Sequence, residues 1–459
     1  MPPIQALSSS DNQHSIPEVE KDYEFAALST VFDPPENPVQ QNECFNNMGP
    51  HCLDSPNQLE HELAAPRQTV ETVDRTESRK RHRSSQLRSK VYTISYLVFF
   101  AALGTLTRLV IETLTFYPGT PVTTSTLWSN VAGSLVMGFL SEDHELFRSG
   151  APQVSTTDPE AGNKATRKAH ISAHKKIIPL YIGLTTGYCG CLTTFSTFMR
   201  DTFLAISNNL PYPLAPYVDI SLFQSIPPSV AKAPNGGFSF MAVLAVLITE
   251  IGLSMVALFT GAHLAIFTKP WMPTVPYSFL RERLDPLMMV LAPLLWVLII
   301  CLATLLPRSP AKGTLWSSSI WRGPFLYSLA FAPVGCLIRF VISVSLNRRI
   351  PSFPLGTFIA NISGTMILGM VFSLQHASLN SSSLGGGSIA GCQVLQGIID
   401  GFCGSLTTVS TWVLELSDSK RRHSYVYGGV SVATALALLV IEVGSLRWTK
   451  GFSTPSCFP

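Results

Sequence analysis

The feature that most constrains this chain is a series of long apolar runs after residue 90. Each run approaches the 20 or so residues that a helix needs to cross the hydrocarbon core of a bilayer. Backbone polar groups in lipid have to be hydrogen-bonded within the chain, so the sequence predicts an all-α integral membrane protein. We expect nine spans, at about 91–112, 126–140, 178–206, 239–267, 286–306, 325–346, 354–374, 394–416 and 425–446.

The composition excludes several other classes of protein. Only 13% of the 459 residues are charged, against roughly 25% in soluble domains, which argues against an ordinary soluble enzyme. The nine cysteines show no metal-binding spacing and do not indicate a secreted disulfide scaffold. The net charge of +3 is too small to indicate nucleic-acid binding.

Residues 1–90 differ from the rest of the chain because they are polar, contain several prolines and lack hydrophobic periodicity. We expect them to form a disordered cytoplasmic tail. The tail ends in the basic run Arg79-Lys80-Arg81-His82-Arg83. A nucleic-acid patch is the alternative, but a basic segment this close to a span is more typical of contact with membrane lipid.

Lysine and arginine predict the orientation of the spans. If the tail is cytoplasmic, the loops on the cytoplasmic side hold 14 Lys and Arg, and those on the opposite side hold 4. This bias predicts a cytoplasmic N-terminus and an extracellular C-terminus. Asn380 would then lie in an external loop as a weak candidate for glycosylation.

The apolar part of the chain contains an internal repeat. Gly104-Thr-Leu-Thr-Arg108 returns as Gly335-Cys-Leu-Ile-Arg339, and Asn130-Val-Ala-Gly133 returns as Asn361-Ile-Ser-Gly364, both 231 residues later. A third segment, 183–201, returns at 397–415 with nine of 19 positions identical. Chance similarity between apolar helices would share leucine and valine rather than these polar residues, so we infer a duplication.

The repeat predicts two four-span units, at 91–267 and 325–446, with a linking transmembrane helix at 286–306. One extra crossing inverts the second unit relative to the first. We therefore expect an internal pseudo-dimer within a monomer, with a shared site at the interface of its inverted halves.

Two pairs of polar residues recur within the spans. A buried arginine is costly in a membrane, so Arg108 and Arg339 are interpreted as an anion-attracting vestibule, with snorkelling to the interface as the alternative. Asn130 and Asn361 are candidates for anion contact through their NH₂ donors. Their alternative role is to hydrogen-bond between helices.

The third span of each unit is interrupted by glycines that weaken a helix, and these precede a Thr-Thr pair. This pattern predicts a broken helix with exposed carbonyls. Two such breaks meeting at the interface would form an oxygen cage suited to a hard cation.

Beyond the first break, Phe195 and Phe198 share a helix face, and Thr193, Ser196 and Thr197 form an adjacent strip of hydroxyls. Phenyl edges carry partial positive charge and, with hydroxyl and amide donors, could replace water around a small anion. Aromatic residues at this spacing are otherwise typical of a core or a lipid-facing surface.

Four acidic residues also lie in or near the spans. Asp201 and Glu415 follow the aromatic and hydroxyl face of the third spans by three residues and are candidates for a vestibule. Glu250 and Glu442 lie in the fourth spans, where they could be structural or carry protons in a coupled transporter. No pattern of catalytic residues occurs in a plausible context, so we expect no enzyme activity.

The motif Gly-x-Cys-Gly-x-Leu-Thr-Thr-Phe-Ser-Thr-Phe, with the upstream Gly-x-x-x-Arg and Asn-x-x-Gly segments, resembles the Fluc/CrcB-type fluoride channels, and the tandem arrangement resembles the fungal fluoride exporters. The resemblance covers roughly residues 91–446. It implies fluoride as the transported ion and a central structural sodium. The residues that it implies are Phe195 and Phe198 as box phenylalanines, Asn130 and Asn361 as pore asparagines, Ser196, Thr197, Ser410 and Thr411 as polar-track hydroxyls, and Gly190, Thr193, Gly404 and Thr407 as sodium ligands through their carbonyls.

The second unit departs from this motif, because Val409 and Trp412 stand where the first unit has phenylalanines. We therefore expect one conducting pore and one weakened pore. The sequence predicts a passive fluoride channel that exports fluoride across the plasma membrane and gives fluoride resistance. A proton-coupled anion transporter and a non-transporting membrane scaffold are the rival hypotheses.

Overall fold

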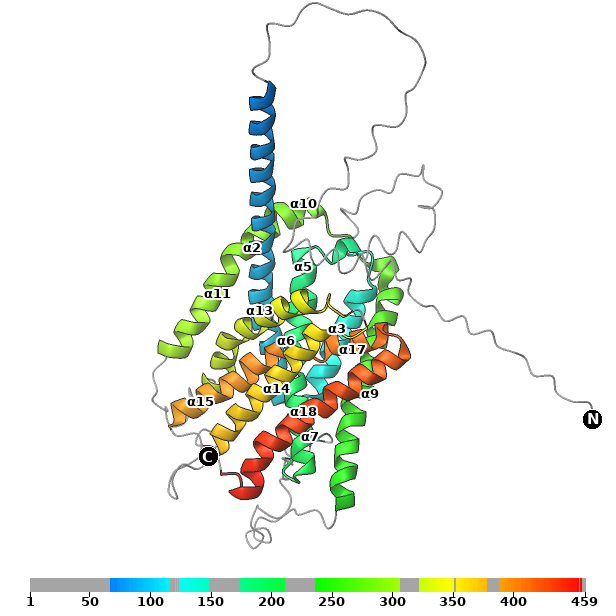
Figure 1. The fold of residues 1–459 in the computed structure, drawn as a ribbon, viewed down its shortest axis with the longest axis vertical. Helices are drawn as coiled ribbons and strands as arrows, with labels where there is room; N and C mark the ends of the chain where they lie inside the picture. Colours follow the sequence, from blue (N-terminus) through cyan, green and yellow to red (C-terminus); the bar gives the residue numbers. More distant parts are fainter. Residues whose placement is uncertain are drawn as a thin grey trace, which may run out of the picture.

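The structure is a computed structural model, and it describes residues 67–115, 120, 122, 124–147, 173–210, 236–305, 322–350, 352–377, 388–453 and 455. Side chains are described from residue 86 onward in the range 67–115 and from residue 325 onward in the range 322–350. The regular elements within this part of the chain are helices (Figure 1). Asn380 and residues 1–66 lie outside the described residues.

The helices fall into two similar series with a linking segment between them. The first series is α2 (Arg67–Thr115), α3 (Leu127–Glu142), α5 (Pro179–Ile182), η2 (Gly183–Cys189), α6 (Gly190–Leu192), α7 (Phe195–Ile206) and α9 (Gly236–Thr268). The linking segment is η3 (Lys269–Trp271), α10 (Tyr277–Phe279), η4 (Leu280–Leu284) and α11 (Asp285–Leu305). The second series is η5 (Arg322–Tyr327), α13 (Ser328–Leu346), α14 (Leu355–His376), α15 (Ile389–Gly397), η6 (Ile398–Cys403), α16 (Gly404–Leu406), α17 (Ser410–Asp418) and α18 (Arg421–Thr449).

Seven helical segments of the described residues are long and apolar enough to cross a membrane. They are Gln86–Thr115, Gly236–Trp271, Tyr277–Leu305, Phe325–Leu346, Leu355–His376, Ile389–Asp418 and Arg421–Thr449. The prediction of an all-helical membrane protein is therefore confirmed. The other two expected spans correspond to α3, which has 16 residues, and to the series α5–α7, which is divided into short helices.

The first helix begins earlier than the sequence analysis predicts. We expected disorder up to residue 90, but α2 begins at Arg67, directly after Pro66, so the prediction is wrong for 67–90. A proline disfavours helical conformation in the residue before it, and the Lys, Arg, Glu and Gln residues that follow are good helix formers. The result is a helix that extends well beyond the bundle (Figure 1).

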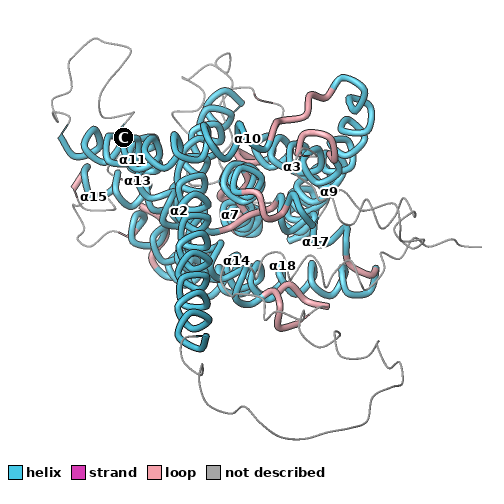
Figure 2. Tube along the Cα trace, turned by 90° about the horizontal axis from the view of Figure 1, so that it is seen from above, coloured by secondary structure: helices cyan, strands magenta, loops and turns pink. Residues whose placement is uncertain are grey.

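Helices of the two series are interleaved. The α3 helix packs on α9 and α14 packs on α18, each within its own series. After the breaks, however, α7 also packs against α14 and α18, and α17 packs against α3 and α9. Viewed from above, α7 lies among helices of both series (Figure 2). The centre of the molecule is therefore an interface between the two halves.

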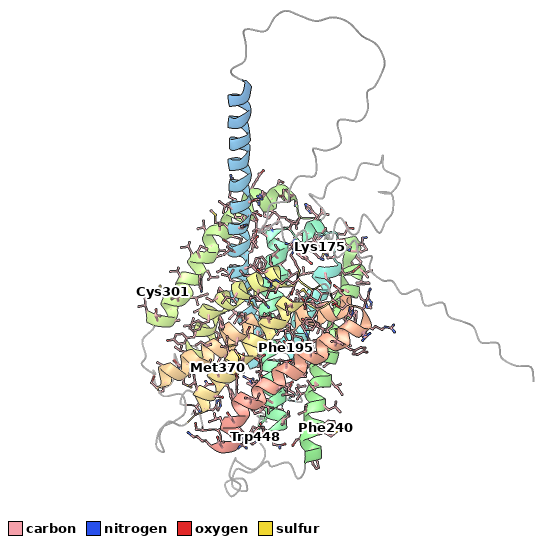
Figure 3. All side chains as sticks on the ribbon, viewed as in Figure 1. Lys175, Phe195, Phe240, Cys301, Met370 and Trp448 are labelled. Carbon is pink, nitrogen blue, oxygen red and sulfur yellow. The ribbon has the colours of Figure 1, made fainter. Side chains whose placement is uncertain are left out.

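The outer face of the bundle is apolar. Large hydrophobic side chains of α9 and α11, such as Phe240, Ile248 and Leu294, are more than half exposed. Figure 3 shows Phe240 and Cys301 at the periphery and Phe195 at the centre. An apolar exterior on helices of this length is what contact with lipid requires.

Candidate functional site

The site is built around two helix breaks. In the first series α6 ends at Leu192, and Thr193 and Thr194 take extended conformations before α7 begins at Phe195. In the second series α16 ends at Leu406, and Thr407 takes a similar conformation before α17 begins at Ser410. A π-helical segment precedes each break, at η2 and η6. The glycine-rich pattern thus correctly predicts where the third span is interrupted.

The threonines at each break cap the helix of the other half. Thr407 Oγ1 accepts from the backbone N–H groups of Phe195 and Ser196 at 3.2 and 3.1 Å. Thr193 Oγ1 accepts in the same way from Val409 and Ser410, at 3.2 and 3.1 Å. The first N–H groups of a helix have no partner within it. Each threonine therefore supplies, across the interface, the cap that its counterpart needs.

Hydroxyl groups fill the space between the breaks. Thr193 Oγ1 lies 3.1 Å from Ser410 Oγ, and Thr407 Oγ1 lies 3.0 Å from Ser196 Oγ. Thr194 Oγ1 is 3.3 Å from Thr197 Oγ1. The predicted hydroxyl strip therefore lies at the interface between the halves. There Thr193 contacts Ser410, and Ser196 contacts Thr407, in the other half.

The two predicted vestibule arginines are buried at the same interface. Arg339 is 2% exposed and donates from Nη1 to the Gly190 carbonyl at 2.7 Å and from Nη2 to the Thr186 carbonyl at 2.6 Å. Arg108 is 1% exposed and donates from Nη2 to the Asp400 carbonyl. Neither side chain extends towards a membrane surface. Each arginine instead donates to backbone carbonyl groups of the other half, Arg339 to two and Arg108 to one.

The residues expected to bind sodium lie at the breaks and fit the ion in part. Carbonyl and hydroxyl oxygens suit a hard cation, and the backbone at Thr193 and Thr407 leaves the helical conformation. The Gly190 carbonyl, however, accepts from Arg339, and a side chain added at Gly404 would meet the Arg108 guanidinium. A sodium ion at these glycines would face a second cation, so Thr193 and Thr407 are the residues that fit it.

Each predicted pore asparagine is fully buried and held by a break. Asn130 Oδ1 accepts from the Thr194 N–H at 2.9 Å, and Asn361 Oδ1 accepts from the Thr408 N–H at 2.8 Å. Because each Oδ1 accepts a hydrogen bond, the orientation of each amide is set, and Nδ2 is the atom that donates.

The donors of the two asparagines have different partners. Asn130 Nδ2 donates to Glu250 Oε2 at 3.0 Å, and Thr126 Oγ1 lies 3.4 Å from Glu250 Oε1. We call Asn130, Thr126, Thr194 and Glu250 the Asn130 cluster. Asn361 Nδ2 instead donates to the Thr408 carbonyl at 3.1 Å.

On the second side, the carboxylate comes from another helix. Glu415 of α17 accepts from Thr357 Oγ1 at 2.6 Å and from the Tyr427 hydroxyl at 2.8 Å. We call Asn361, Thr357, Thr408 and Glu415 the Asn361 cluster. Asp201, the counterpart of Glu415 in the repeat, is 3% exposed and forms an ion pair with Arg200 at 2.9 Å.

The aromatic rings also meet across the interface. Phe195 and Phe198 are in edge contact, with centroids 5.7 Å apart, and the Phe195 ring lies 5.3 Å from that of Trp412. All three are buried. The aromatic elements are therefore shared between the halves, whereas the sequence analysis assigned both to one copy.

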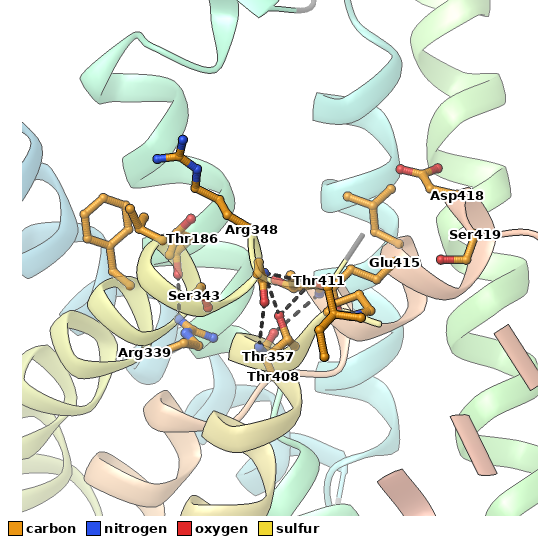
Figure 4. Close-up of a pocket in the computed structure, with 16 residues that line it drawn as sticks. Thr186, Arg339, Ser343, Arg348, Thr357, Thr408, Thr411, Glu415, Asp418 and Ser419 are labelled. Atoms are coloured by element: carbon orange, nitrogen blue, oxygen red, sulfur yellow. Dashed lines mark hydrogen bonds between the residues drawn. The ribbon is translucent and has the colours of Figure 1, made fainter. Parts of the chain in front are cut away.

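A cavity of about 240 Å³ reaches the second break. Arg339, Thr357, Thr408, Thr411 and Glu415 line it, and Arg348 lies at its edge (Figure 4). The predicted vestibule residues Arg339 and Glu415 thus border an open space. Arg108 and Asp201 do not line this cavity.

Sequence reasoning missed two residues that organise the clusters. Thr126 and Thr357 are matched in the repeat, at the same offset as the asparagines, and each contacts a carboxylate. Their recurrence four residues before the asparagine, on the same helix face, was the available signal.

Comparison with known proteins places these features in context. The family model described as "CrcB-like protein, Camphor Resistance (CrcB)" matches residues 95–231 and 326–444. Fluoride export protein 1 of Neurospora crassa is 42% identical, over 98% of this chain and 86% of that protein, and its namesake in Candida albicans is 31% identical over 77% and 80%. The fluoride-specific ion channel FluC of Acinetobacter baylyi is 32% identical over 26% of this chain and 81% of its own length. No solved structure matches the chain.

Proposed function

The chain belongs to the CrcB-like family, and on that premise we propose that it is a passive, fluoride-selective channel that exports fluoride from the cytoplasm. It is a membrane transport protein and not an enzyme. Fluoride that leaves through it no longer accumulates in the cell, so its activity gives fluoride resistance.

The observation that carries this proposal is the fixed orientation of the buried asparagines. Because Oδ1 of Asn130 and of Asn361 is held by a backbone N–H, Nδ2 is the donor of each amide, and fluoride would replace its present acceptor, Glu250 or the Thr408 carbonyl. Amide and hydroxyl donors and phenyl edges attract a small anion without binding it so tightly that it cannot leave. Phe195, Phe198 and Trp412 supply the rings, and Ser196, Thr197, Ser410 and Thr411 supply hydroxyls along the path.

Passive flow is sufficient for export. A membrane potential favours the exit of an anion from a negative interior by roughly 2.3 kcal/mol per 100 mV. Arg339, Glu415 and, in the other half, Arg108 and Asp201 belong to the vestibule regions in this proposal. Arg339 and Glu415 are supported by the cavity that they line.

The proposed topology has nine spans and two inverted four-span repeats. The seven long helical segments, the short α3 and the broken series α5–α7 would together make nine spans. With α11 as the single crossing between the repeats, the second is inverted relative to the first. The distribution of Lys and Arg supports a cytoplasmic N-terminus and an extracellular C-terminus in the plasma membrane. The functional unit is a monomer that contains its own pseudo-dimer.

A structural sodium ion between the breaks belongs to the same proposal. The Thr193 and Thr407 carbonyls are the groups that would hold it, with Gly190 and Gly404 nearby. The ion would supply a positive charge that holds the two breaks together, and it would not be transported.

Flux from liposomes tests the proposal. The purified full chain is reconstituted with fluoride or chloride inside, and a potassium-diffusion potential is applied. We expect release of fluoride and retention of chloride. No fluoride release would support the scaffold hypothesis, whereas concentrative flux driven by a pH gradient at zero voltage would support the proton-coupled transporter.

A further inference from the structure

The two clusters differ in what occupies the asparagine donor. In the Asn130 cluster, Glu250 is 2% exposed and lies on the α9 helix, and its Oε2 accepts from Asn130 Nδ2 at 3.0 Å. A carboxylate oxygen at this distance takes the same donor that a fluoride ion would need. A carboxyl oxygen of the protein thus takes the donor that the transported anion would need.

Among the described residues of the second half, the asparagine donor is bound by a backbone carbonyl and not by a carboxylate. On α9 the buried positions include Glu250, Ser254 and Leu258, and on α18 they include Tyr427, Ser431 and Ala435 with the same spacing of four residues. Matching the two serines places Tyr427 opposite Glu250, whereas the run Leu-Ala-x-Leu-x-x-Glu-x-Gly at 244–252 and 436–444 pairs Glu250 in sequence with Glu442, whose Oε2 lies against Gly369. The Tyr427 hydroxyl donates to Glu415 at 2.8 Å, and Asn361 Nδ2 donates to a backbone carbonyl.

The surroundings of the Asn361 cluster are also better suited to conduction. The cavity reaches Thr408, whose N–H and carbonyl both bind the Asn361 amide. The Phe195 and Trp412 rings are in contact, and Trp412 lies near Gly428 of α18, the helix that packs on α14. Phe195 begins α7, which packs against α14 and α18 of the second half. Its counterpart Val409 precedes α17, which packs against α3 and α9, and valine has no electropositive ring edge to offer there.

We propose that the Glu250 carboxylate closes the path through the Asn130 cluster, so that fluoride crosses through the Asn361 cluster. The Glu250 side chain occupies the Asn130 donor that a mobile anion would need. This inference rests on the proposed function and assigns the unequal pores to a specific side chain.

The test is fluoride efflux from liposomes that contain full-length variants. Asn361→Asp keeps the oxygen that accepts from Thr408 but places a negative charge in the proposed open path, and we expect efflux to fall about 100-fold. Adding Glu250→Ser should open the other path and raise efflux at least about tenfold above Asn361→Asp alone. The matched control is Asn361→Asp with Glu442→Ser, which removes an intramembrane carboxylate from α18 and should restore nothing.

A single variant provides a second test that does not depend on the double variant folding. Glu250→Ser alone should raise efflux by up to about twofold over wild type, because it frees the Asn130 donor and adds a second path to the one already open. No rise in a folded Glu250→Ser protein, or no recovery in a folded Asn361→Asp/Glu250→Ser protein, overturns the role of Glu250. A wild-type protein that releases no fluoride would instead overturn the proposed function itself.

Discussion

Replacement of Arg339 tests whether the buried arginines hold the interface or attract anions. The guanidinium makes two short hydrogen bonds, at 2.7 Å to the Gly190 carbonyl and at 2.6 Å to the Thr186 carbonyl. Hydrogen bonds to a charged group contribute about 1.5–3 kcal/mol each. Arg339→Met removes both and leaves two buried carbonyls without this donor, so we expect a loss of about 3–6 kcal/mol in the free energy of unfolding.

The assay is the thermal unfolding of the purified protein in detergent. With roughly 1 °C of melting temperature lost per kcal/mol in a chain of this size, Arg339→Met should melt roughly 3–6 °C below wild type. Arg339→Lys keeps the charge but lacks the planar fork that spans two carbonyls, and should lose an intermediate amount. Arg348→Met is the matched control, because Arg348 lines the same cavity but is exposed, and should change stability by no more than about 0.5 kcal/mol.

One result would refute the reasoning. If Arg339→Met melts within about 1 °C of wild type and yet loses fluoride efflux, the guanidinium does not hold the break. Arg339 would then act mainly on the anion, as the sequence analysis first proposed.

Three further predictions concern packing, the rings and sodium. Gly138→Ala should destabilise the protein by several kcal/mol, because the added Cβ would overlap the Leu258 carbonyl on α9. Gly252 has open space around it, so Gly252→Ala should raise the free energy of unfolding by up to about 1 kcal/mol. Thermal unfolding measures both changes. Phe195→Ile should lower fluoride efflux more than Phe198→Ile, because only Phe195 is in ring contact with Trp412, and equal effects would contradict this difference. Replacing sodium by N-methylglucamine should lower the melting temperature, by an amount equivalent to about 2.7 kcal/mol if sodium was present at 100 times its dissociation constant; an unchanged melting temperature would contradict a structural ion.

The recurring local patterns were sufficient to predict much of the fold. Runs of apolar residues predict helices in lipid whatever their neighbours are, and the glycines before Thr193 and Thr407 weaken a helix locally. These features depend on residues close together in the chain. The break positions and the burial of Asn130 were therefore accessible without coordinates.

The partners of polar side chains were not accessible in this way. Arg339 and Gly190 are 149 residues apart, and Asn130 and Glu250 are 120 residues apart. Helical periodicity predicts which residues share a face but not which face of another helix they meet. The hydrogen bonds of the arginines to carbonyls of the other half, and the exchange of threonine caps, therefore could not be predicted. The helical extension of α2 was missed for a different reason, because its polar sequence lacks an apolar stripe.

Covalent linkage of the two halves explains how the site can be asymmetric. In a symmetric dimer of identical chains every substitution occurs twice, so a carboxylate that closed one path would close both. Here a carboxyl binds the asparagine donor in the first half and a backbone carbonyl binds it in the second, and Phe195 is matched by Val409, so each half can change alone. The reciprocal caps of Thr193 and Thr407 are kept in both halves, because each helix depends on the other half for its first N–H groups. Interface contacts therefore remain symmetric, while residues along the paths are free to diverge.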